Sequence, residues 1–282
     1  MKQKPARSSF ASLLQEEVQF KEEEYPKVTV IIPTLNASAL ISITMENVVN
    51  QDYPNLEIIL IDSGSIDRTI EIVKSFKDKR IKIYSVSEYS RYEMLNHGIS
   101  HADGVYINFL FPGDFFISNQ SVRWMMNLAL QNNEPHLVYG GSLLNTGKTD
   151  VKILYRPLTL DLLKSGRQPT SIQACFFKNE VFKILGKLDS NLSLRGGFDL
   201  FCRFMLNGTL SFQSTSRVIT DYDIRSVTRN MVVAHFFETM SIINRYFGLW
   251  TVFTWLGKQS DVTRYLKLWF RSVRVAFLGK AS

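Results

Sequence analysis

Residues 27–69 read KVTVIIPTLNASALISITMENVVNQDYPNLEIILIDSGSIDRT. Within this stretch, residues 28–33 and 56–62 form two short apolar runs rich in β-branched side chains, and the residues between them have a helical character. This order predicts a βαβ unit, in which two parallel strands end at the same edge of a sheet. The stretch therefore indicates an open α/β fold.

Polar, turn-forming residues follow each of the two predicted strands. Thr34 and Asn36 come after the first strand, and Asp62, Ser63 and Ser65 come after the second. In open α/β sheets, ligands bind outside the carboxyl ends of the strands. We therefore expect these side chains to hold a nucleotide, and the plainer alternative is that they only turn the chain.

The alternation of strands and helices continues beyond this unit. We expect strands at 81–86, 105–111 and 136–139, with helices at 39–50, 69–76, 92–101 and 121–131. After about residue 150 we expect a strand at 175–177, helices at 180–185 and 199–207, Gly208 as a helix C-cap, and helical structure from 231 onward. Together these elements predict a doubly wound α/β sheet.

The fourth predicted strand is followed by Pro112, Gly113 and Asp114. A carboxylate at the carboxyl end of a parallel strand can hold a divalent cation that bridges phosphates. The alternative is a plain turn, because Pro-Gly-Asp is also good turn chemistry.

Three tracts resemble the glycosyltransferase family 2 domain: VTVIIPTLN, VVNQDYPNLEIILIDSGSIDRT and YEMLNHGISHADGVYINFLFPGD. A weaker match continues through QPTSIQACFFKNEVFKILGKLDSNLSLRGGFDLFCRF. The resemblance implies a GT-A fold, that is, a Rossmann-like, mostly parallel sheet flanked by helices. It also implies an inverting hexosyl- or N-acetylhexosaminyltransferase that uses a nucleotide-sugar, with UDP as the expected nucleotide.

The resemblance also assigns roles to individual residues. It implies that a group of side chains binds the nucleotide-sugar: Pro33, Thr34, Asn36, Asp62, Ser63, Glu93, Asn96 and Asp114. Asp62 would read the uracil or ribose, and Asp114 would hold a divalent cation, Mn²⁺ or Mg²⁺. Asp199, Leu200 and Arg203 match the helix beside the acceptor site. Arg91 is a candidate partner for the phosphates, although a solvated loop charge is the plainer interpretation.

Two glycines depart from the family pattern. The metal-binding Asp-x-Asp region retains one carboxylate, Asp114, and Gly113 precedes it. Gly197 stands where the family most often has its catalytic base. Asp199 either takes over as the base or anchors its helix. These departures support an alternative hypothesis, a catalytically impaired GT-A-fold protein that binds a nucleotide-sugar or serves as a scaffold.

The chain of 282 residues is 45% hydrophobic and carries a net charge of +7. Residues 262–278 predict a basic amphipathic helix, which places Arg264, Lys267, Arg271 and Arg274 on one face. Such a helix fits an anionic membrane surface, and the alternative is that it packs on the sheet domain. Residues 246–257 are uncharged but too short to span a bilayer. Cys175 and Cys202 have no metal or redox spacing and are expected to be buried.

We expect three regions: a leader helix within 1–26 that is not a signal peptide, a glycosyltransferase domain at 27–225, and a basic, amphipathic, helical extension at 226–282. The leading hypothesis is a metal-assisted transferase, cytoplasmic and peripheral at the inner face of the membrane. It would act on a cell-envelope polysaccharide or a lipid-linked saccharide. A nucleotidyltransferase is less favoured because the first strand is not followed by a glycine-rich phosphate loop with a nearby lysine. A nucleic-acid binder is the least favoured.

Overall fold

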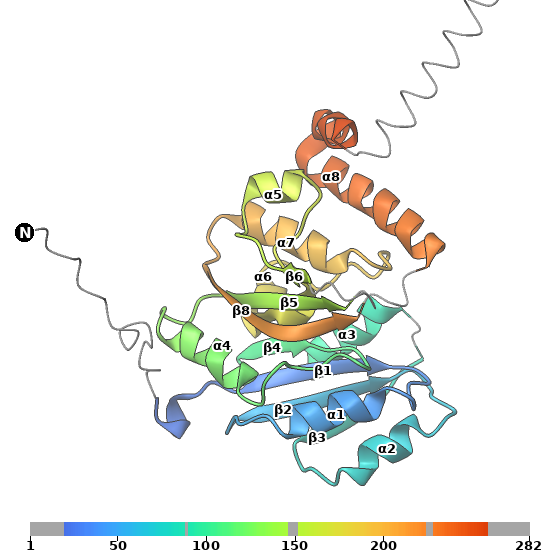
Figure 1. Ribbon diagram of the computed structural model, residues 1–282, viewed down its shortest axis with the longest axis vertical. Coiled ribbons are helices and arrows are strands. Elements are labelled where there is room, and N and C mark those ends of the chain that lie inside the picture. The colour runs from blue at the N-terminus through green and yellow to red at the C-terminus, as the bar shows by residue number, and fades with distance from the viewer. Residues whose placement is uncertain (1–19, 88–89, 146–151, 224–227, 259–282) are drawn as a thin grey trace, which may run out of the picture.

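The computed structural model describes residues 20–87, 90–145, 152–223 and 228–258, which form one eight-stranded sheet with helices on both faces (Figure 1). The strands lie in the order β3-β2-β1-β4-β7-β5-β6, and β8 pairs with β5. The first four strands along the chain are parallel: β1 Val28–Thr34, β2 Leu56–Asp62, β3 Ile81–Ser85 and β4 Tyr106–Phe109. The others are β5 Leu137–Asn145, β6 Lys152–Leu154, β7 Cys175–Lys178 and β8 Phe212–Asp223. The expected α/β architecture, a mostly parallel sheet flanked by helices, is therefore confirmed.

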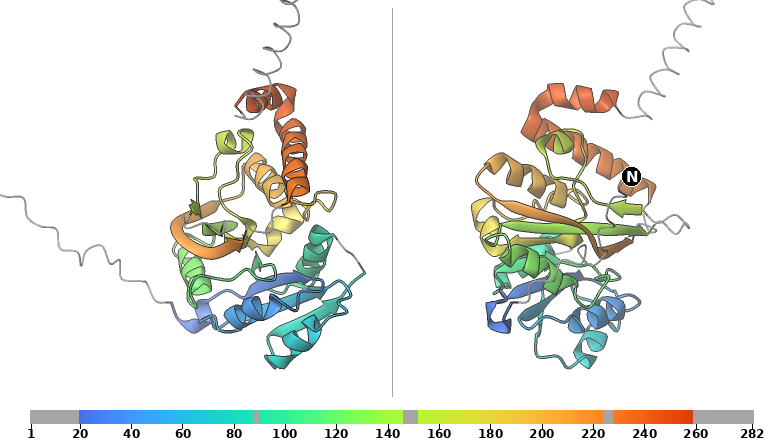
Figure 2. Two further views of the ribbon diagram at one scale, coloured as in Figure 1. Left: turned by 45° about the vertical axis from the view of Figure 1, so that its right-hand side comes forward. Right: turned by 60° about the vertical axis from the view of Figure 1, so that its left-hand side comes forward.

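Helices cover the two faces of the sheet in separate layers (Figure 2). One face carries α1 Ile41–Val49, α2 Thr69–Ser75 and α4 Ser121–Leu130. The opposite face carries α3 Arg91–His101, α6 Asn179–Ile184 and α7 Gly196–Asn207, with α5 Leu160–Lys164 and α8 Arg229–Gly257 packed outside them. Two short 3₁₀ helices, η2 Glu22–Glu24 and η3 Ile172–Ala174, complete the described elements.

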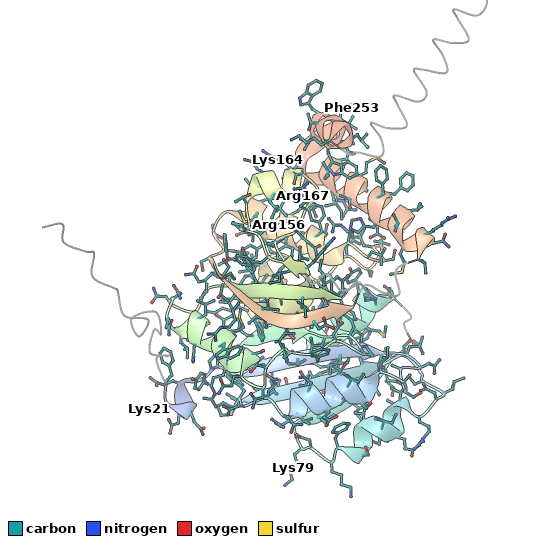
Figure 3. All side chains as sticks on the ribbon, viewed as in Figure 1. Lys21, Lys79, Arg156, Lys164, Arg167 and Phe253 are labelled. Atoms are coloured by element: carbon teal, nitrogen blue, oxygen red, sulfur yellow. The ribbon has the colours of Figure 1, made fainter. Side chains whose placement is uncertain are left out.

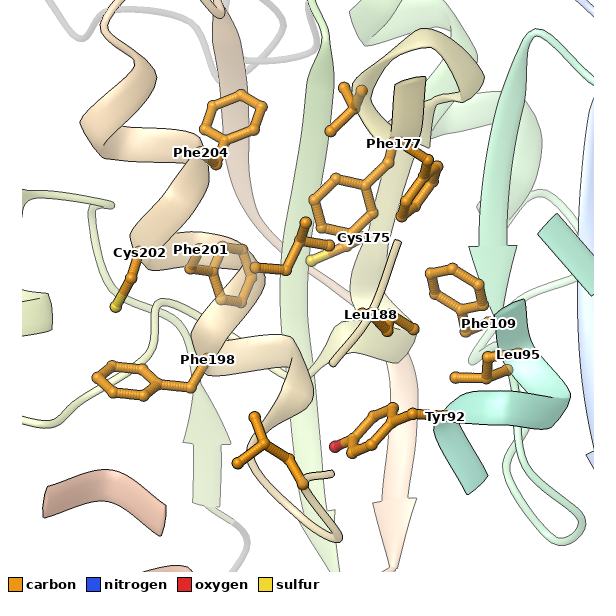
Figure 4. Close-up of a cluster of buried hydrophobic side chains, with 14 of the residues drawn as sticks. Tyr92, Leu95, Phe109, Cys175, Phe177, Leu188, Phe198, Phe201, Cys202 and Phe204 are labelled. Atoms are coloured by element: carbon orange, nitrogen blue, oxygen red, sulfur yellow. The ribbon is translucent and has the colours of Figure 1, made fainter. Parts of the chain in front are cut away.

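Strand periodicity explains why the protein has two cores. Along β1, Val30 and Ile32 face the core under α1, while Ile31 between them faces the core under α3. Because side chains alternate along a strand, a run that is apolar at every position must be covered on both faces. Figure 4 shows the core on the α3 side, where aromatic side chains such as Phe109, Phe177 and Phe201 fill the space between sheet and helices.

The two cysteines belong to this α3-side core, as the sequence predicts. Both Cys175 and Cys202 are fully buried free thiols. Burial raises the pKa of Cys202 to about 12, so its thiol stays protonated at neutral pH. Their role is packing.

Glu57 ties the sheet together at the end opposite the predicted ligand edge. Its buried carboxylate accepts hydrogen bonds from the Thr29 hydroxyl (2.5 Å) and the Asp103 amide (3.0 Å), and it pairs with Lys82 at 2.7 Å. Burial alone would raise the pKa of Glu57, but these bonds outweigh it and lower the pKa. Glu57 therefore joins β1, β2, β3 and the turn before β4.

The structure extends the sheet beyond the predicted strands. β5 was expected to end at Tyr139, before two glycines, but it continues to Asn145. Gly140 lies against β8, where an added Cβ would be 2.2 Å from Cγ1 of Ile219. These glycines therefore allow close strand packing and do not end the strand. β6, α5 and β8 were not predicted at all.

Several expectations concern residues that the structure does not describe. The basic helix at 262–278 lies wholly outside the described residues, and of the helix expected near 10–24 only η2 lies within them. Among the described helices, none combines the length and apolarity that crossing a membrane requires. β8 ends at Asp223 and α8 begins at Arg229, on either side of the expected boundary at 225, which stays a prediction.

Candidate active site

The loops after β1 and β2 meet at one edge of the sheet. Thr34 and Asp62 are direct neighbours in the parallel register, as are Pro33 and Ile61. The amide of Ser63 donates to the carbonyl oxygen of Thr34 at 3.0 Å. The side chains of Thr34, Asp62 and Ser63 are buried, and among the described residues the Thr34 hydroxyl has no hydrogen-bond partner. A buried polar atom without a partner is costly unless a ligand or water completes it.

Hydrogen bonds fix the shape of these two loops. The Asp62 carboxylate accepts from the amides of Gly64 (3.2 Å) and Ser65 (3.0 Å). Asn36 has a left-handed backbone (φ 48°), and its amide donates to the Ser65 hydroxyl at 2.9 Å. Its side-chain oxygen in turn accepts from the Ile66 amide at 2.9 Å. Asn36 therefore joins the two loops, and the sequence predictions for Thr34, Asn36, Asp62 and Ser63 fall in one place.

Asp114 reaches the same edge from the other side of β1. β4 pairs with β1, and the turn after β4 is held by Thr44 of α1, whose hydroxyl donates to the Asp114 carbonyl oxygen (2.8 Å). The same hydroxyl accepts from the amide of Gly113 at 2.8 Å. Gly113 has φ 98°, a conformation that other residues rarely adopt. The glycine that precedes Asp114 is thus required by the turn itself.

The Asp114 carboxylate is buried and only partly neutralised. Its Oδ2 accepts from Nε2 of Gln173 (2.9 Å) and from the amide of Phe111 (3.1 Å). Burial raises the pKa of Asp114 to about 6, with Gln173, Phe111 and the positive charge of Arg91 acting in the opposite direction. The carboxylate of Asp221 on β8 adds to the rise. Asp114 and Asp221 are the two carboxylates at this edge that could hold a divalent cation, although no group of three or more His, Cys, Asp or Glu side chains in the described ranges is placed to bind a metal.

Arg91 lies close to this carboxylate, at the start of α3. Its guanidinium sits 4.4 Å from the centre of the Phe111 ring and lowers the pKa of Asp114. Burial raises the pKa of Tyr222 on β8, and Arg91 and Asp114 also influence it, in opposite directions. Arg91, Asp114 and Asp221 therefore form one charged cluster, with the Tyr222 hydroxyl next to it, beside the loops that follow β1 and β2.

Glu93 and Asn96 lie further along α3 and form a separate group. With His97, Ser100 and Lys187 they line an open pocket of about 220 Å³. The Asn96 side chain bonds both the amide (2.9 Å) and the carbonyl oxygen (2.8 Å) of Leu188. Within the described part of the chain, no hydrogen bond or ion pair joins Glu93 or Asn96 to Asp62 or Asp114. Their predicted contact with the nucleotide stays a prediction.

Asp199 is a buried anchor between α7 and α8. It is 1% exposed and lies in the first turn of α7. Oδ2 accepts from Nε of Arg203 at 2.8 Å, while Oδ1 accepts from the Tyr246 hydroxyl at 2.8 Å and pairs with Arg245 at 3.5 Å. The sequence left two roles open for Asp199, catalytic base and helix anchor. This geometry fits the anchor.

The neighbouring glycines of α7 differ in the space around them. A Cβ on Gly196 would lie 2.6 Å from Cζ of Tyr92, whose hydroxyl accepts a hydrogen bond from the Gly196 amide at 2.9 Å. A Cβ on Gly197 would make ordinary contact with the side chain of Ile172, at 3.4 Å. Gly196 is therefore required by packing, whereas Gly197 is not.

Sequence reasoning missed three of the residues that surround Asp114. Gln173 belongs to η3, and Asp221 and Tyr222 belong to β8. Both elements are distant from Asp114 in the sequence, and β8 was not predicted. Asp221 reaches the site because its amide bonds the Phe115 carbonyl oxygen (3.0 Å), next to the bridge between Phe116 and Thr220. No local pattern in the sequence signals this pairing.

The chain is similar to known glycosyltransferases. An uncharacterized glycosyltransferase of Haemophilus influenzae is 38% identical over 116 residues, which cover 40% of this chain and 45% of that protein. The chain thus matches somewhat less than half the length of this relative.

Solved structures share the fold. The S. aureus TarS fragment 1–349 in complex with UDP-GlcNAc matches with a TM-score of 0.64 and 17% identity, over 78% of this chain and 66% of that one. The mannosyltransferase PcManGT from Pyrobaculum calidifontis, in complex with GDP-Man and Mn²⁺, matches with a TM-score of 0.56 and 16% identity, over 92% and 83%. The family model for glycosyl transferase family 2 matches residues 29–173, just over half of the chain. The protein therefore belongs to glycosyl transferase family 2.

Proposed function

We propose that this protein transfers a sugar from a nucleoside diphosphate sugar, a UDP-sugar, to an acceptor hydroxyl with inversion at the anomeric carbon. The observation that carries the proposal is the meeting of Thr34, Asp62 and Asp114 at one edge of the sheet, with Arg91 beside Asp114. Ligands of open α/β sheets bind at this edge. The solved neighbours TarS and PcManGT, which carry UDP-GlcNAc and GDP-Man, support the donor class.

A divalent cation fits the residues at this edge. Asp114 and Asp221 would hold it, because their buried or nearly buried carboxylates repel each other and a cation would relieve that repulsion. When bound, the cation takes up negative charge of the diphosphate. Arg91 would contact the phosphate oxygens from the start of α3, and the Thr34 hydroxyl and the Asn36 loop would hold the nucleoside. The Mn²⁺ in PcManGT supports this assignment.

The transfer itself is a single displacement. The acceptor oxygen bonds to the anomeric carbon as the bond from that carbon to the diphosphate breaks, and the nucleotide leaves with the electron pair. The hydroxyl proton must pass to a base within hydrogen-bond reach. We propose that Asp199 positions α7, since Arg203, Arg245 and Tyr246 engage both of its oxygens. The proton would then pass to a water molecule beside Gly197, the position where the family most often has its base.

A second candidate function keeps the binding site without the reaction. The absence of a carboxylate at Gly197 and the engagement of Asp199 favour a catalytically impaired protein that binds a nucleotide-sugar. Both candidates predict the same donor site, and they differ only in turnover.

One assay separates the two candidates. The full chain is incubated with UDP-glucose, UDP-galactose, UDP-GlcNAc and GDP-mannose, with and without Mn²⁺, and free nucleotide is measured over time. Metal-dependent release of the nucleotide, even slow hydrolysis without an acceptor, is expected of the enzyme. Tight binding with no release from any donor in the presence of acceptor extracts would favour the impaired protein.

For the acceptor we propose a lipid-linked saccharide or a cell-envelope polysaccharide, with the protein peripheral at the cytoplasmic face of the membrane. The support is the basic character of the sequence after residue 257, where Lys258–Ser282 carries six basic residues and one acidic residue. Anionic lipid attracts such segments.

A further inference from the structure

The last turns of α8 form a helix with two apolar sides. α8 bends at Gly248, which has φ 80° and ψ 167°, and from Tyr246 to Gly257 the chain carries no charged residue. A soluble helix at a protein surface normally has one polar side. This segment therefore has a second apolar side where a surface helix would normally be polar.

One of the two sides packs on the protein. Val252 and Trp255 are buried, and the Trp255 ring stacks near Phe236 with 5.1 Å between ring centres. Trp255 also lies against Gly166, where an added Cβ would be 2.5 Å from its Nε1. The loop after α5 and the end of α8 are therefore in direct contact.

Within residues 20–87, 90–145, 152–223 and 228–258, no side chain packs over the other side. Leu249, Trp250 and Phe253 are 65%, 80% and 63% exposed. Phe253 comes four residues after Leu249 and three after Trp250, so it is a neighbour of both on the helix surface. We call these three residues the apolar ridge. Figure 3 shows Phe253 on α8 near one end of the molecule and Lys79 near the opposite end. Exposed aromatic groups that lie together in this way mark an interaction surface.

Positive charge lies at the same end of the molecule, next to the packed side of this helix. Lys164 and Arg167 are exposed on either side of Gly166, the residue in contact with Trp255, and Lys258 follows α8 directly. Burial and the neighbouring charge of Arg167 both lower the pKa of Arg156, so these two guanidinium groups lie close together. Asp161 is the one acidic residue between 156 and 168. This end of the molecule therefore presents aromatic and cationic groups together.

We propose that the apolar ridge, with Lys164, Arg167 and Lys258, docks on an anionic phospholipid surface and inserts Trp250 and Phe253 at the level of the headgroups. This inference rests on the proposed function. It adds to it a membrane-contact surface on the folded part of the chain, besides the C-terminal segment. Aromatic side chains with flanking cations suit the membrane interface. A second copy of the same basic surface would be repelled, and three side chains give far less area than a stable dimer needs, about 800 Å² per partner.

The position of the ridge also links it to the acceptor side of the site. Arg245 and Tyr246, the residues that bind Asp199 of α7, lie just before the bend at Gly248. Docking through the ridge would therefore hold α7 close to the membrane surface, where a lipid-linked acceptor is anchored.

The test uses the full chain and vesicles of two compositions, phosphatidylcholine alone and phosphatidylcholine with about 30% phosphatidylglycerol. In flotation, the wild type is expected to bind the anionic vesicles and not the neutral ones. The double variant Trp250→Ser/Phe253→Ser is expected to bind at least about tenfold more weakly although its C-terminal segment is intact. Its matched control is Ile43→Ser/Ile184→Ser, which removes exposed apolar groups elsewhere and should bind as the wild type does.

Two charge-reversal variants test the contribution of the cations. Lys164→Glu/Arg167→Glu is expected to weaken binding by about tenfold or more, whereas Lys74→Glu/Lys79→Glu, an equal charge change on and after α2, should not. The tryptophan fluorescence of the wild type should shift to shorter wavelength on anionic vesicles, and that shift should be smaller in Trp250→Ser/Phe253→Ser. Equal flotation of the ridge variant and the wild type would overturn the proposal, and so would a concentration-dependent dimer that only the ridge variant loses. UDP binding is measured on the same samples to keep the two proposals apart. If the wild type did not bind UDP, the donor site would be contradicted and the docking surface would not.

Discussion

At the scale of single residues, the buried carboxylate of Asp114 lowers the free energy of unfolding once it is ionised. Because burial raises its pKa to about 6, above the usual 3.8, the native state favours the protonated acid. Stability from this group is present below about pH 4 and is lost as pH rises through about 6. Asp114→Asn, which keeps an oxygen to accept from Gln173 and Phe111, should therefore stabilise the metal-free protein by up to about 3 kcal/mol at pH 8. Urea unfolding at pH 8 and pH 4 checks this, and an equal change at both values would contradict it.

The same residue governs metal affinity. A carboxylate must lose its proton to bind a cation, so Mn²⁺-dependent UDP affinity is expected to rise as pH increases from about 5 to 7. Calorimetric titration across this range gives the midpoint. A flat profile would remove Asp114 from the cation site.

Gly197 offers a gain-of-function test. Its surroundings accept a Cβ, and an acidic side chain in the first turn of a helix is favourable by about 0.5 kcal/mol. Gly197→Asp should therefore leave the melting temperature unchanged or higher, and it should raise nucleotide release if the base slot lies there. Gly196→Asp is the control, since its Cβ meets the Tyr92 ring and should destabilise the fold by about 2 kcal/mol. Unaltered turnover in a stable Gly197→Asp protein would separate this position from the chemistry.

At the scale of elements, Glu57 shows how one buried carboxylate holds several strands together. Its carboxylate joins three strands, so Glu57→Gln should lower the free energy of unfolding by about 2 kcal/mol at pH 7. Because its pKa is lowered in the native state, this contribution is present above about pH 4.5 and disappears as pH falls through the native pKa. Glu71→Gln, which breaks the exposed pair between Glu71 and Arg68, should lower the free energy of unfolding much less. Similar losses for both variants would refute the assignment.

Asp199 links α7 and α8 in the same way. Asp199→Asn would leave Arg203 and Arg245 without their shared carboxylate, and a loss of about 3 kcal/mol is expected. Tyr246→Phe removes one hydrogen bond to the same carboxylate and should cost about 1 kcal/mol. Chemical denaturation measures both. If Asp199→Asn kept full stability yet lost turnover, Asp199 would be the base.

The elements that the sequence predicted correctly are those whose signals are local. β1, β2 and α1 combine an apolar period with clear turn residues, and their bounds lie within two residues of the prediction. β8 escaped prediction because its residues are mostly polar and its pairing with β5 depends on a bulge and on the contact of Ile219 with Gly140. The site residues on β1, β2 and the β4 turn were therefore found, while Gln173, Asp221 and Tyr222 were not.

At the scale of the whole molecule, one edge of the sheet gathers loops from four strands. The ends of β1, β2 and β4 supply the predicted polar groups, and β8 adds Asp221 across the turn that holds Asp114. The other end of the molecule, formed by α5 and α8, carries the apolar ridge and its cations. A donor site and a docking surface on different parts of one body suit a transferase that works beside a membrane.

Calorimetric titration of UDP into the wild-type protein and into Asp114→Asn, each with and without Mn²⁺ at pH 7.5, tests the central claim most directly. We expect Mn²⁺ to strengthen UDP binding to the wild type by at least about tenfold, and we expect the substitution to remove that gain while leaving the weak metal-free binding in place. Equal UDP affinity in all four titrations would contradict the claim that Asp114 and a cation hold a nucleotide at this edge.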